Sequence, residues 1–323
     1  MRRKKKISKS NAKLIRTLIY IAIIVIIGVL SNYTDIFATE DVENGIKKEA
    51  KIVEGKLEMH TIDVGQGDSI LLLQGDKVML IDCGTRAQGK KVVEYLQNLG
   101  IKKIDILVGT HPHEDHVGGM AEVINSFEIG MLYTSDFNDE DITTVYYMKF
   151  LEAVENKKVK WETKKAKDKF EFGEADVTVL APSKDNYDNT NNYSLALMVS
   201  FGETDIMLTG DAEKLIENEI LGLDYDIECE VFKAGHHGSD TSNTDKFLKK
   251  VNPSYVIISA GLENSYNHPV KSVMKRFKSM GIKVYRTDEA GDIVMTTDGQ
   301  NIEFNQKEGS YLSGPELVKK KGS

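Results

Sequence analysis

The feature that most constrains the fold of this chain is a polar loop that directly follows an apolar strand at 104–108. The loop has the sequence THPHEDHVGG over Thr110–Gly119. Imidazole suits zinc and similar metals, and carboxylate also accepts harder ions such as manganese. Residues two apart in a non-helical loop can point the same way, so two neighbouring ions can be bound. The loop therefore predicts a metal centre, whose candidate ligands are His111, His113, Asp115 and His116.

Strand-like and helical stretches alternate around this loop. Short β-rich runs at 57–63, 69–73 and 77–81 are separated by turns that contain glycine. A helical stretch with one apolar face follows at 89–99. An Asp-Gly pair within Thr297–Gln300 predicts a closing hairpin. This alternation predicts an α/β fold, with helices covering either one sheet or two.

The N-terminal residues 1–38 differ in composition from the rest of the chain. A basic stretch precedes the uncharged run Leu18–Leu30 (LIYIAIIVIIGVL), which fits either a signal peptide cut after Ala38 or a membrane anchor. Positive charge on the N-terminal side keeps that side cytoplasmic, so we expect the rest of the chain to be translocated. We expect a linker at 39–56, one globular domain at 57–306 and a flexible tail at 307–323.

The net charge of −8 hides an asymmetry along the chain. Residues 1–38 contain eight of the 42 Lys and Arg residues and one of the 50 Asp and Glu residues. The rest of the chain therefore contains 34 basic and 49 acidic residues. The body therefore carries about −15 and repels nucleic acid in bulk, because affinity for DNA comes largely from basic side chains. A nucleic-acid substrate would need a local basic track or metal ions at the site.

Further short motifs appear in a fixed order along the domain. They are His60–Asp68 (HTIDVGQGD), Leu80–Gly84 (LIDCG), Asn191–Leu195 (NNYSL), Leu208–Asp211 (LTGD), His236–Ser239 (HHGS), Asn264–Pro269 (NSYNHP) and Arg286–Asp288 (RTD). With the metal loop, they resemble the metallo-β-lactamase superfamily and, within it, the hydrolase domains of the ComEC family of DNA-uptake competence proteins, over 57–304. The multispanning channel part of those proteins has no counterpart here, so we expect a free-standing relative.

The resemblance implies a four-layer αββα metallo-β-lactamase sandwich that holds two divalent metals, zinc or manganese. By matching position, His111 and His113 hold one metal, Asp115 and His116 hold the other, and Asp211 bridges the two. Asp211 and the pair His236 and His237 each follow an apolar strand, where ligands converge in layered folds. One histidine of the pair is expected to bind metal, with His236 favoured, and the other to lie behind the ligands or act as an acid.

Further roles also follow from the resemblance. Asp82 is expected to orient the metal loop through hydrogen bonds, and Asp63 is expected to lie behind the ligands. Asp115 or Asp211 would position the attacking water, and His237 or His268 would protonate the leaving oxygen. Asp63 lies on a glycine-rich turn together with Gln66 and Asp68, two of the side chains expected to contact substrate. The same sequence is equally compatible with a purely structural role, in which a carboxylate closes a tight turn. The side chains expected to contact substrate are Gln66, Asp68, Asn192 and Ser239.

One departure from the superfamily pattern concerns the first metal. Members with a complete two-metal site supply a third histidine from the loop before a central strand, where this chain has Asn191 and Asn192. An amide oxygen or a water is a weaker ligand. We therefore expect the first metal to be bound less tightly than the second, to be a harder ion such as manganese, or to be missing.

These features together predict an extracytoplasmic hydrolase that is anchored or secreted. The resemblance favours a nuclease or phosphodiesterase acting on DNA or another phosphodiester. An esterase that removes phosphocholine-like groups from an envelope polymer is the second possibility, and a non-hydrolytic binding module in DNA uptake is the alternative from another class. A β-lactamase is disfavoured by the missing histidine. The membrane is an expected partner through the N-terminal segment, and nothing in the sequence indicates a protein partner.

Overall fold

The computed structural model describes residues 55–136 and 143–322. The chain divides into two compact units, one of residues 1–48 with 224–226 and one of 49–223 with 227–323. All helices and strands described below belong to the second unit. The expected signal or anchor at 1–38 lies outside the described residues. Within the described residues, no helix is both long and apolar enough to cross a membrane.

The first sheet has eight strands in the spatial order β15-β14-β1-β2-β3-β4-β5-β6. Its first three strands in sequence form an antiparallel meander, and β3 to β6 run parallel. The strands are β1 (Leu57–Thr61), β2 (Ile70–Gln74), β3 (Lys77–Ile81), β4 (Lys103–Gly109), β5 (Glu128–Thr134), β6 (Trp161–Thr163), β14 (Ile293–Thr297) and β15 (Ile302–Phe304).

The second sheet has seven strands in the order β13-β12-β11-β10-β9-β8-β7. It is antiparallel from β7 to β10 and parallel from β10 to β13. The strands are β7 (Lys169–Phe172), β8 (Ala175–Ala181), β9 (Ala196–Phe201), β10 (Thr204–Leu208), β11 (Val231–Lys233), β12 (Tyr255–Ile258) and β13 (Lys283–Arg286).

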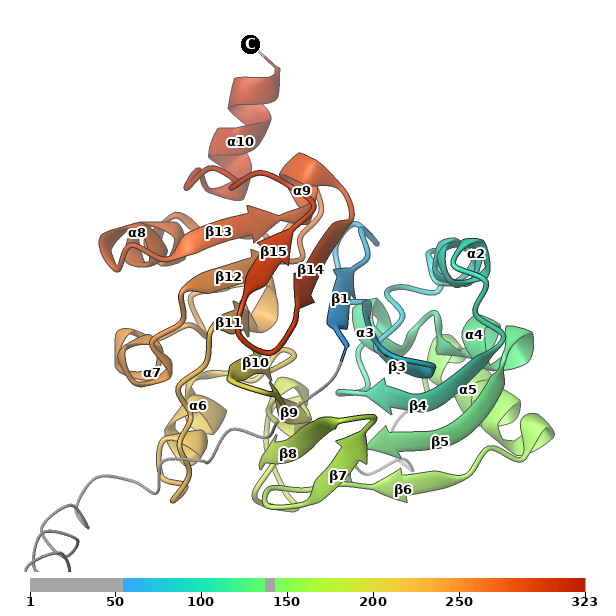
Figure 1. The fold of residues 1–323 in the computed structure, drawn as a ribbon. Coiled ribbons are helices and arrows are strands. Elements are labelled where there is room, and N and C mark those ends of the chain that lie inside the picture. The colour runs from blue at the N-terminus through green and yellow to red at the C-terminus, as the bar shows by residue number, and fades with distance from the viewer. Residues whose placement is uncertain (1–54, 137–142, 323) are drawn as a thin grey trace, which may run out of the picture. The chain divides into compact units, whose positions relative to one another are not determined.

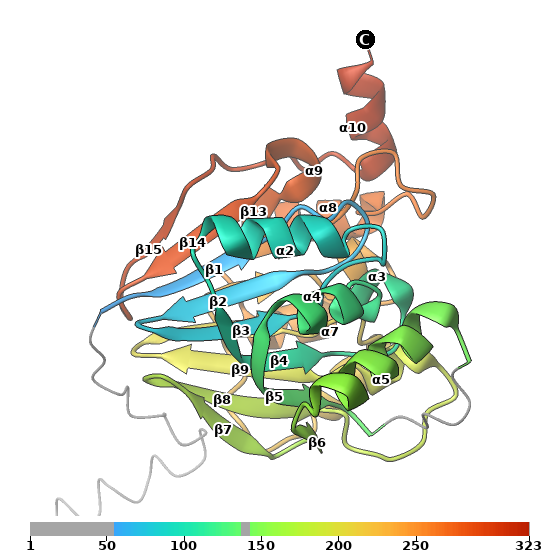
Figure 2. The same ribbon diagram turned by 90° about the vertical axis from the view of Figure 1, so that its right-hand side faces the viewer.

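Helices cover the outer face of each sheet (Figures 1 and 2). The first sheet is covered by α2 (Gly89–Asn98), α4 (Met120–Ser126) and α5 (Val145–Lys157), and the second by α6 (Lys214–Ile220), α7 (Asp245–Val251) and α8 (Lys271–Ser279). The remaining elements connect these helices and strands or follow them, namely α3 (Glu114–Val117), η2 (Thr190–Tyr193), η3 (Gly235–Gly238), α9 (Thr287–Ala290) and α10 (Gly314–Lys321). The unit is therefore the four-layer αββα arrangement that the sequence predicts, with two sheets rather than one.

A central strand such as β2 is apolar on both faces because both of its faces are buried. In β2, Leu71 packs with the helix residues Val92 and Leu96, whereas its neighbours Ile70 and Leu72 pack in the core between the sheets. This is the period of two that a strand imposes on its side chains. Burying each such side chain contributes about 1.5–3 kcal/mol. The two cores fix the sheets against each other and hold the strand ends in place.

The C-terminal segment corrects one prediction. The sequence predicts a flexible tail over 307–323, but the structure forms α10 there. Ser313 and Glu316 make a reciprocal capping box at the start of this helix, and Leu317 is buried. The buried guanidinium of Arg286 donates hydrogen bonds to backbone carbonyls of the segment before the helix. This segment is held by one buried apolar side chain, Leu317, and by Arg286 from another element. The sequence therefore shows no apolar periodicity that would predict an ordered helix here.

Candidate metal centre

The metal loop is held in place by the buried side chain of Asp82, at the end of β3. Its Oδ1 accepts a hydrogen bond from Thr110 N at 2.9 Å, and its Oδ2 accepts one from Thr110 Oγ1 at 2.7 Å. The same Oδ2 lies 2.7 Å from His116 Nδ1. Asp82 therefore fixes both the start of the loop and the ring of His116, as the sequence predicts.

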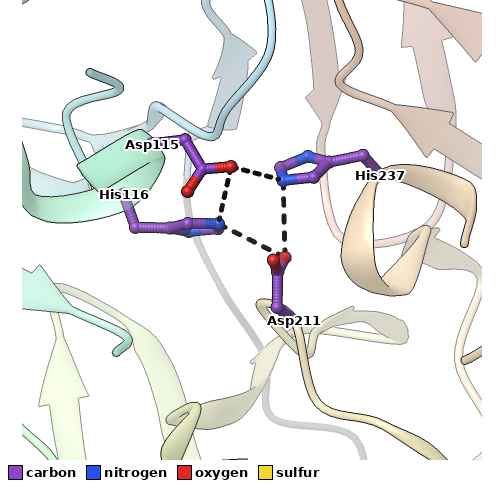
Figure 3. A group of neighbouring side chains, drawn as sticks. All are labelled: Asp115, His116, Asp211 and His237. Carbon is purple, nitrogen blue, oxygen red and sulfur yellow. Dashed lines mark ion pairs between the residues drawn. The ribbon is translucent and has the colours of Figure 1, made fainter. Parts of the chain in front are cut away.

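Four side chains converge at this edge of the two sheets (Figure 3). We call Asp115, His116, Asp211 and His237 the four-residue group. Asp211 Oδ1 lies 3.3 Å from His116 Nε2 and 3.5 Å from His237 Nε2, and Asp115 Oδ2 lies 3.4 Å from His237 Nε2. Two residues come from the metal loop, and the other two follow β10 and β11 of the second sheet. The centre is therefore built from both sheets.

A second set of potential ligands adjoins the first. We call His111, His113 and Asp211 the three-residue group. His111 Nε2 lies 3.1 Å from His113 Nδ1 and 3.8 Å from Asp211 Oδ2. Asp211 thus belongs to both groups and offers one carboxylate oxygen to each, which is the geometry that a bridging ligand requires.

The four-residue group fits a divalent metal. His116 Nε2, His237 Nε2 and Asp211 Oδ1 are buried polar atoms without a hydrogen-bond partner in the described part of the chain. Leaving such atoms unpaired is unfavourable unless another group satisfies them. Imidazole nitrogens together with carboxylate oxygens are the ligand set of zinc and of related divalent ions. A metal bound between these atoms would satisfy all three.

The electrostatics also favour a cation at this position. Burial disfavours charged imidazole, but the carboxylates of Asp211 and Asp82 outweigh it and raise the pKa of His116 well above its usual range. In the same way, Asp211 and Asp68 overcome burial and raise the pKa of His237 to about 10. Burial alone would raise the pKa of Asp211, but His116 and His237 hold it well below its usual range. The carboxylates therefore stabilise positive charge in the group.

A buried lysine behind the group was not foreseen from the sequence. Lys233 ends β11 and is 1% exposed, with its Nζ 2.9 Å from Asp68 Oδ1. Asp68 Oδ1 also lies 3.4 Å from His237 Nδ1, and Asp68 N donates to Asp115 O at 3.0 Å. Asp68 was expected to contact substrate, but the structure buries it against Lys233. The one signal in the sequence for this buried pair was the position of Lys233 at the end of an otherwise apolar strand.

The expected order of the histidine pair is reversed. His237, not His236, completes the four-residue group, and its Nδ1 lies 3.0 Å from Ser259 O, which directs Nε2 towards the other ligands. His236 lies at the edge, 21% exposed, with Nε2 3.5 Å from Asp211 Oδ2. Both residues have positive φ, 49° and 54°, so the chain turns sharply and the rings separate. Sequence adjacency could not show which ring faces inwards.

His268 lies beside this pair. Its ring centroid is 5.4 Å from that of His236 and 6.4 Å from that of His237, and the ring of Tyr266 stacks against it. Burial and the two neighbouring histidines lower the pKa of His268 to about 4. The structure therefore brings His268 to the edge of the centre as a neutral imidazole.

The remaining predicted residues form hydrogen bonds with other parts of the chain. The Oδ1 of Asp63 accepts a hydrogen bond from Gly65 N at 3.0 Å and closes a tight turn, and its expected role behind the ligands stays a prediction. The substrate contacts expected of three other side chains stay predictions. Each of these three hydrogen-bonds to a nearby loop: Gln66 to Gly261, Ser239 to Thr241 and Asn192 to Glu213.

Comparisons with known proteins agree with this geometry. The family model described as the metallo-β-lactamase superfamily matches residues 62–261. ComE operon protein 3 of Bacillus subtilis is 32% identical over 263 residues, which cover 74% of this chain and 33% of that protein. Competence protein ComA of Neisseria gonorrhoeae is 30% identical over 231 residues, covering 71% of this chain and 30% of that protein. The chain thus spans about a third of the length of these relatives.

Solved structures share the fold at low sequence identity. CmlA, a diiron β-hydroxylase from Streptomyces venezuelae, superimposes with a TM-score of 0.52 at 11% identity, over 76% of this chain and 55% of that one. At this identity the likeness concerns the fold alone.

Proposed function

Because the chain belongs to the metallo-β-lactamase superfamily, whose members are generally hydrolases, we propose that it is a metal-dependent phosphodiesterase or nuclease acting outside the cytoplasmic membrane. The observation that carries the proposal is the carboxylate of Asp211. It is shared by two adjoining groups of ligands, as in a centre that holds two metals. Two adjacent cations would balance the charge that develops on a phosphodiester. They would also offset the repulsion between such a substrate and the acidic body.

The chain's own residues can be assigned roles around such a centre. A bound divalent metal supplies an activated water and a counter-charge. Asp115 is 27% exposed at its side chain, more than Asp211 at 2%, so its carboxylate is placed to orient a water. With His237 among the ligand candidates, His268 is the imidazole left to donate a hydrogen bond to the leaving oxygen. Asp82 and Ser259 hold the rings of His116 and His237 in place.

The choice of a phosphodiester rests on the relatives. The two relatives reported above are named ComE operon protein 3 and Competence protein ComA, and the matched regions cover 74% and 71% of this chain. Zinc and manganese both fit the nitrogen and oxygen ligands. The extracytoplasmic location rests on the basic and apolar segment within residues 1–38.

The activity is tested with the purified full-length chain after chelation and reloading with zinc or manganese. We expect hydrolysis of bis-p-nitrophenyl phosphate, and loss of it in His113→Ala and in Asp115→Asn. His60→Gln is the control, because His60 is a buried histidine that hydrogen-bonds to Tyr95 outside the centre. Unchanged hydrolysis in the two ligand variants contradicts the proposal. Hydrolysis of p-nitrophenylphosphorylcholine alone indicates the esterase alternative, and metal binding without any hydrolysis indicates a binding module.

The location has a separate test. A phosphatase reporter fused after residue 323 is expected to be active, since it folds only after export. The size of the fusion on a gel then distinguishes cleavage near Ala38 from a retained anchor. A reporter that stays inactive in the cytoplasm contradicts the extracytoplasmic part of the proposal.

A further inference from the structure

A groove of about 480 Å³ lies between α8 and α10. Lys271, Lys275 and Lys278 line it from α8, and Glu316 and Lys320 line it from α10. The segment before α10 lies between the two helices and completes the lining. Figure 2 shows α10 standing out from the sheets beside α8. The groove is therefore open to solvent and lysine side chains reach it from both helices.

The charge of this groove is opposite to that of the body. Helix α8 (KSVMKRFKS) has four basic residues and no acidic one, and α10 ends in three consecutive lysines. Glu316 is already engaged by Lys271 and by the helix cap at Ser313. Lys275 and Lys278 are exposed, and within 55–136 and 143–322 neither forms an ion pair. A basic surface on a body of about −15 is the local track that an anionic polymer would need.

The groove begins at the edge of the metal centre. His268 is separated from the start of α8 by only two residues. Gly314, the first residue of α10, donates its N–H to Pro269 O at 2.9 Å. Both helices thus begin next to the backbone of His268, whose ring lies 5.4 Å from that of His236. A chain lying in the groove would reach the centre at its His268 side.

An exposed aromatic ring marks the same place. Tyr266 is 63% exposed, and its ring stacks on that of His268 at a centroid distance of 5.7 Å and an interplanar angle of 22°. A large aromatic side chain with one face packed and most of its surface in water is an available platform for a flat ring. Proteins that bind single strands combine such platforms with a basic groove, because each base offers a face for stacking.

We propose that the α8–α10 groove and Tyr266 form a binding track for a single nucleic-acid strand that leads to the metal centre. The phosphates would lie along Lys275 and Lys278, and a base next to the centre would stack on Tyr266. A single strand fits better than other anionic polymers, because a polymer without bases gains nothing from the exposed ring. The inference deepens the proposed function and relies on it for the fate of the strand, whereas binding itself requires no hydrolysis.

The test measures binding by the full-length chain in the presence of chelator, so that it does not depend on catalysis. The probe is a fluorescent single-stranded DNA of about 12 nucleotides, followed by anisotropy over a range of salt concentrations. The groove variant carries Lys275→Gln and Lys278→Gln. The matched control carries Lys249→Gln and Lys250→Gln, two exposed lysines of α7 that do not line the groove. The N-terminal basic segment is present in every protein compared, so its contribution cancels.

We expect the groove variant to bind at least about tenfold more weakly at low salt, and its slope of log affinity against log salt to fall by about 1.4. Tyr266→Ala should weaken binding by about tenfold at every salt concentration, because stacking is not ionic. The α7 control should match the unmodified chain. Equal binding by the groove variant and the α7 control overturns the proposal.

Two further probes decide between occupants. If polyglycerol phosphate, which has no bases, binds as tightly as DNA and Tyr266→Ala has no effect, the groove is a site for an envelope polymer and the proposal is wrong. Groove-dependent binding only to phosphatidylglycerol vesicles overturns it in favour of a membrane contact. DNA binding that depends on the groove, without hydrolysis of bis-p-nitrophenyl phosphate by metal-loaded chain, supports the track and contradicts the proposed activity instead.

Discussion

The two ligand groups that share Asp211 differ in what lies behind their imidazole rings. In the four-residue group, His116 is held by the Asp82 carboxylate at 2.7 Å. His237 is held by Ser259 O at 3.0 Å and faces Asp68, which is itself held by Lys233. Metal-binding imidazoles are commonly oriented in this way by carboxylates and carbonyls, which also make them stronger ligands.

The three-residue group has weaker support. His111 Nδ1 lies 3.1 Å from Thr110 Oγ1 and 3.3 Å from Ser194 Oγ, and its Nε2 faces His113. The supporting groups are hydroxyls rather than carboxylates. Asn192 stands where a third imidazole is expected, and its amide oxygen accepts a hydrogen bond from Glu213 N instead. The comparison indicates one preorganised site and one open site, joined by a single carboxylate.

The largest effect is expected where the two groups meet. In Asp211→Asn, both groups lose their shared anionic ligand, so hydrolysis should fall by at least about 10³-fold and neither metal should be retained. Hydrolysis rate and metal content by mass spectrometry check this. Asp298→Asn is the control, since Asp298 caps a turn remote in sequence from the ligands. An Asp211→Asn protein that keeps two metals shows that the groups are independent.

The next effect concerns the support behind the four-residue group. Lys233→Met leaves the buried Asp68 carboxylate without its cation, so the free energy of unfolding in urea should fall by about 3–5 kcal/mol. The double variant Lys233→Met, Asp68→Asn should regain part of this loss, because no buried charge remains unpaired.

The surface pair Lys103 and Asp105, 2.8 Å apart, provides the matched control. Lys103→Met should change the free energy of unfolding by less than about 1 kcal/mol. If Lys233→Met is no more destabilising than Lys103→Met, the buried pair does not support the four-residue group.

A smaller effect is expected at the open site. Asn192→His should tighten the weaker metal by about tenfold, because an imidazole is a better ligand than an amide. Calorimetric titration of the chelated protein with zinc and manganese measures both steps, and the tighter step serves as the internal control. Two equally tight zinc steps in the unmodified protein contradict the idea of an open site.

A further difference between the two groups concerns the protons released when metal binds. The pKa of His237 is raised to about 10 and that of His116 is also raised, whereas burial lowers the pKa of His111 and of His113. Metals bind neutral imidazole, so the four-residue group must lose protons near neutral pH. The metal affinity of the four-residue group should fall as the pH drops from about 10 towards 7. The metal affinity of the three-residue group should stay constant at any pH above the lowered pKa values of His111 and His113. Calorimetry in buffers with different heats of ionisation measures the number of protons released at each metal-binding step. Equal proton release at both steps contradicts this prediction.

Much of the centre could be predicted because its ligands lie at strand ends that local patterns define. The loop with His111, His113, Asp115 and His116 and the strand end at Asp211 were assigned from the sequence, and the structure brings them together. Most predicted strands and helices also lie within a few residues of the observed ones. These features depend on neighbours along the chain, where apolar periodicity and ligand spacing are visible.

Other features were decided only by the tertiary structure. The choice of His237 over His236 depends on two positive φ angles and on Ser259 O, which is remote in sequence. The pairing of Lys233 with Asp68 joins residues 165 positions apart. The ordered C-terminus depends likewise on Arg286. In each case the determining partner lies on another element, so only folding places it within reach and makes the interaction possible.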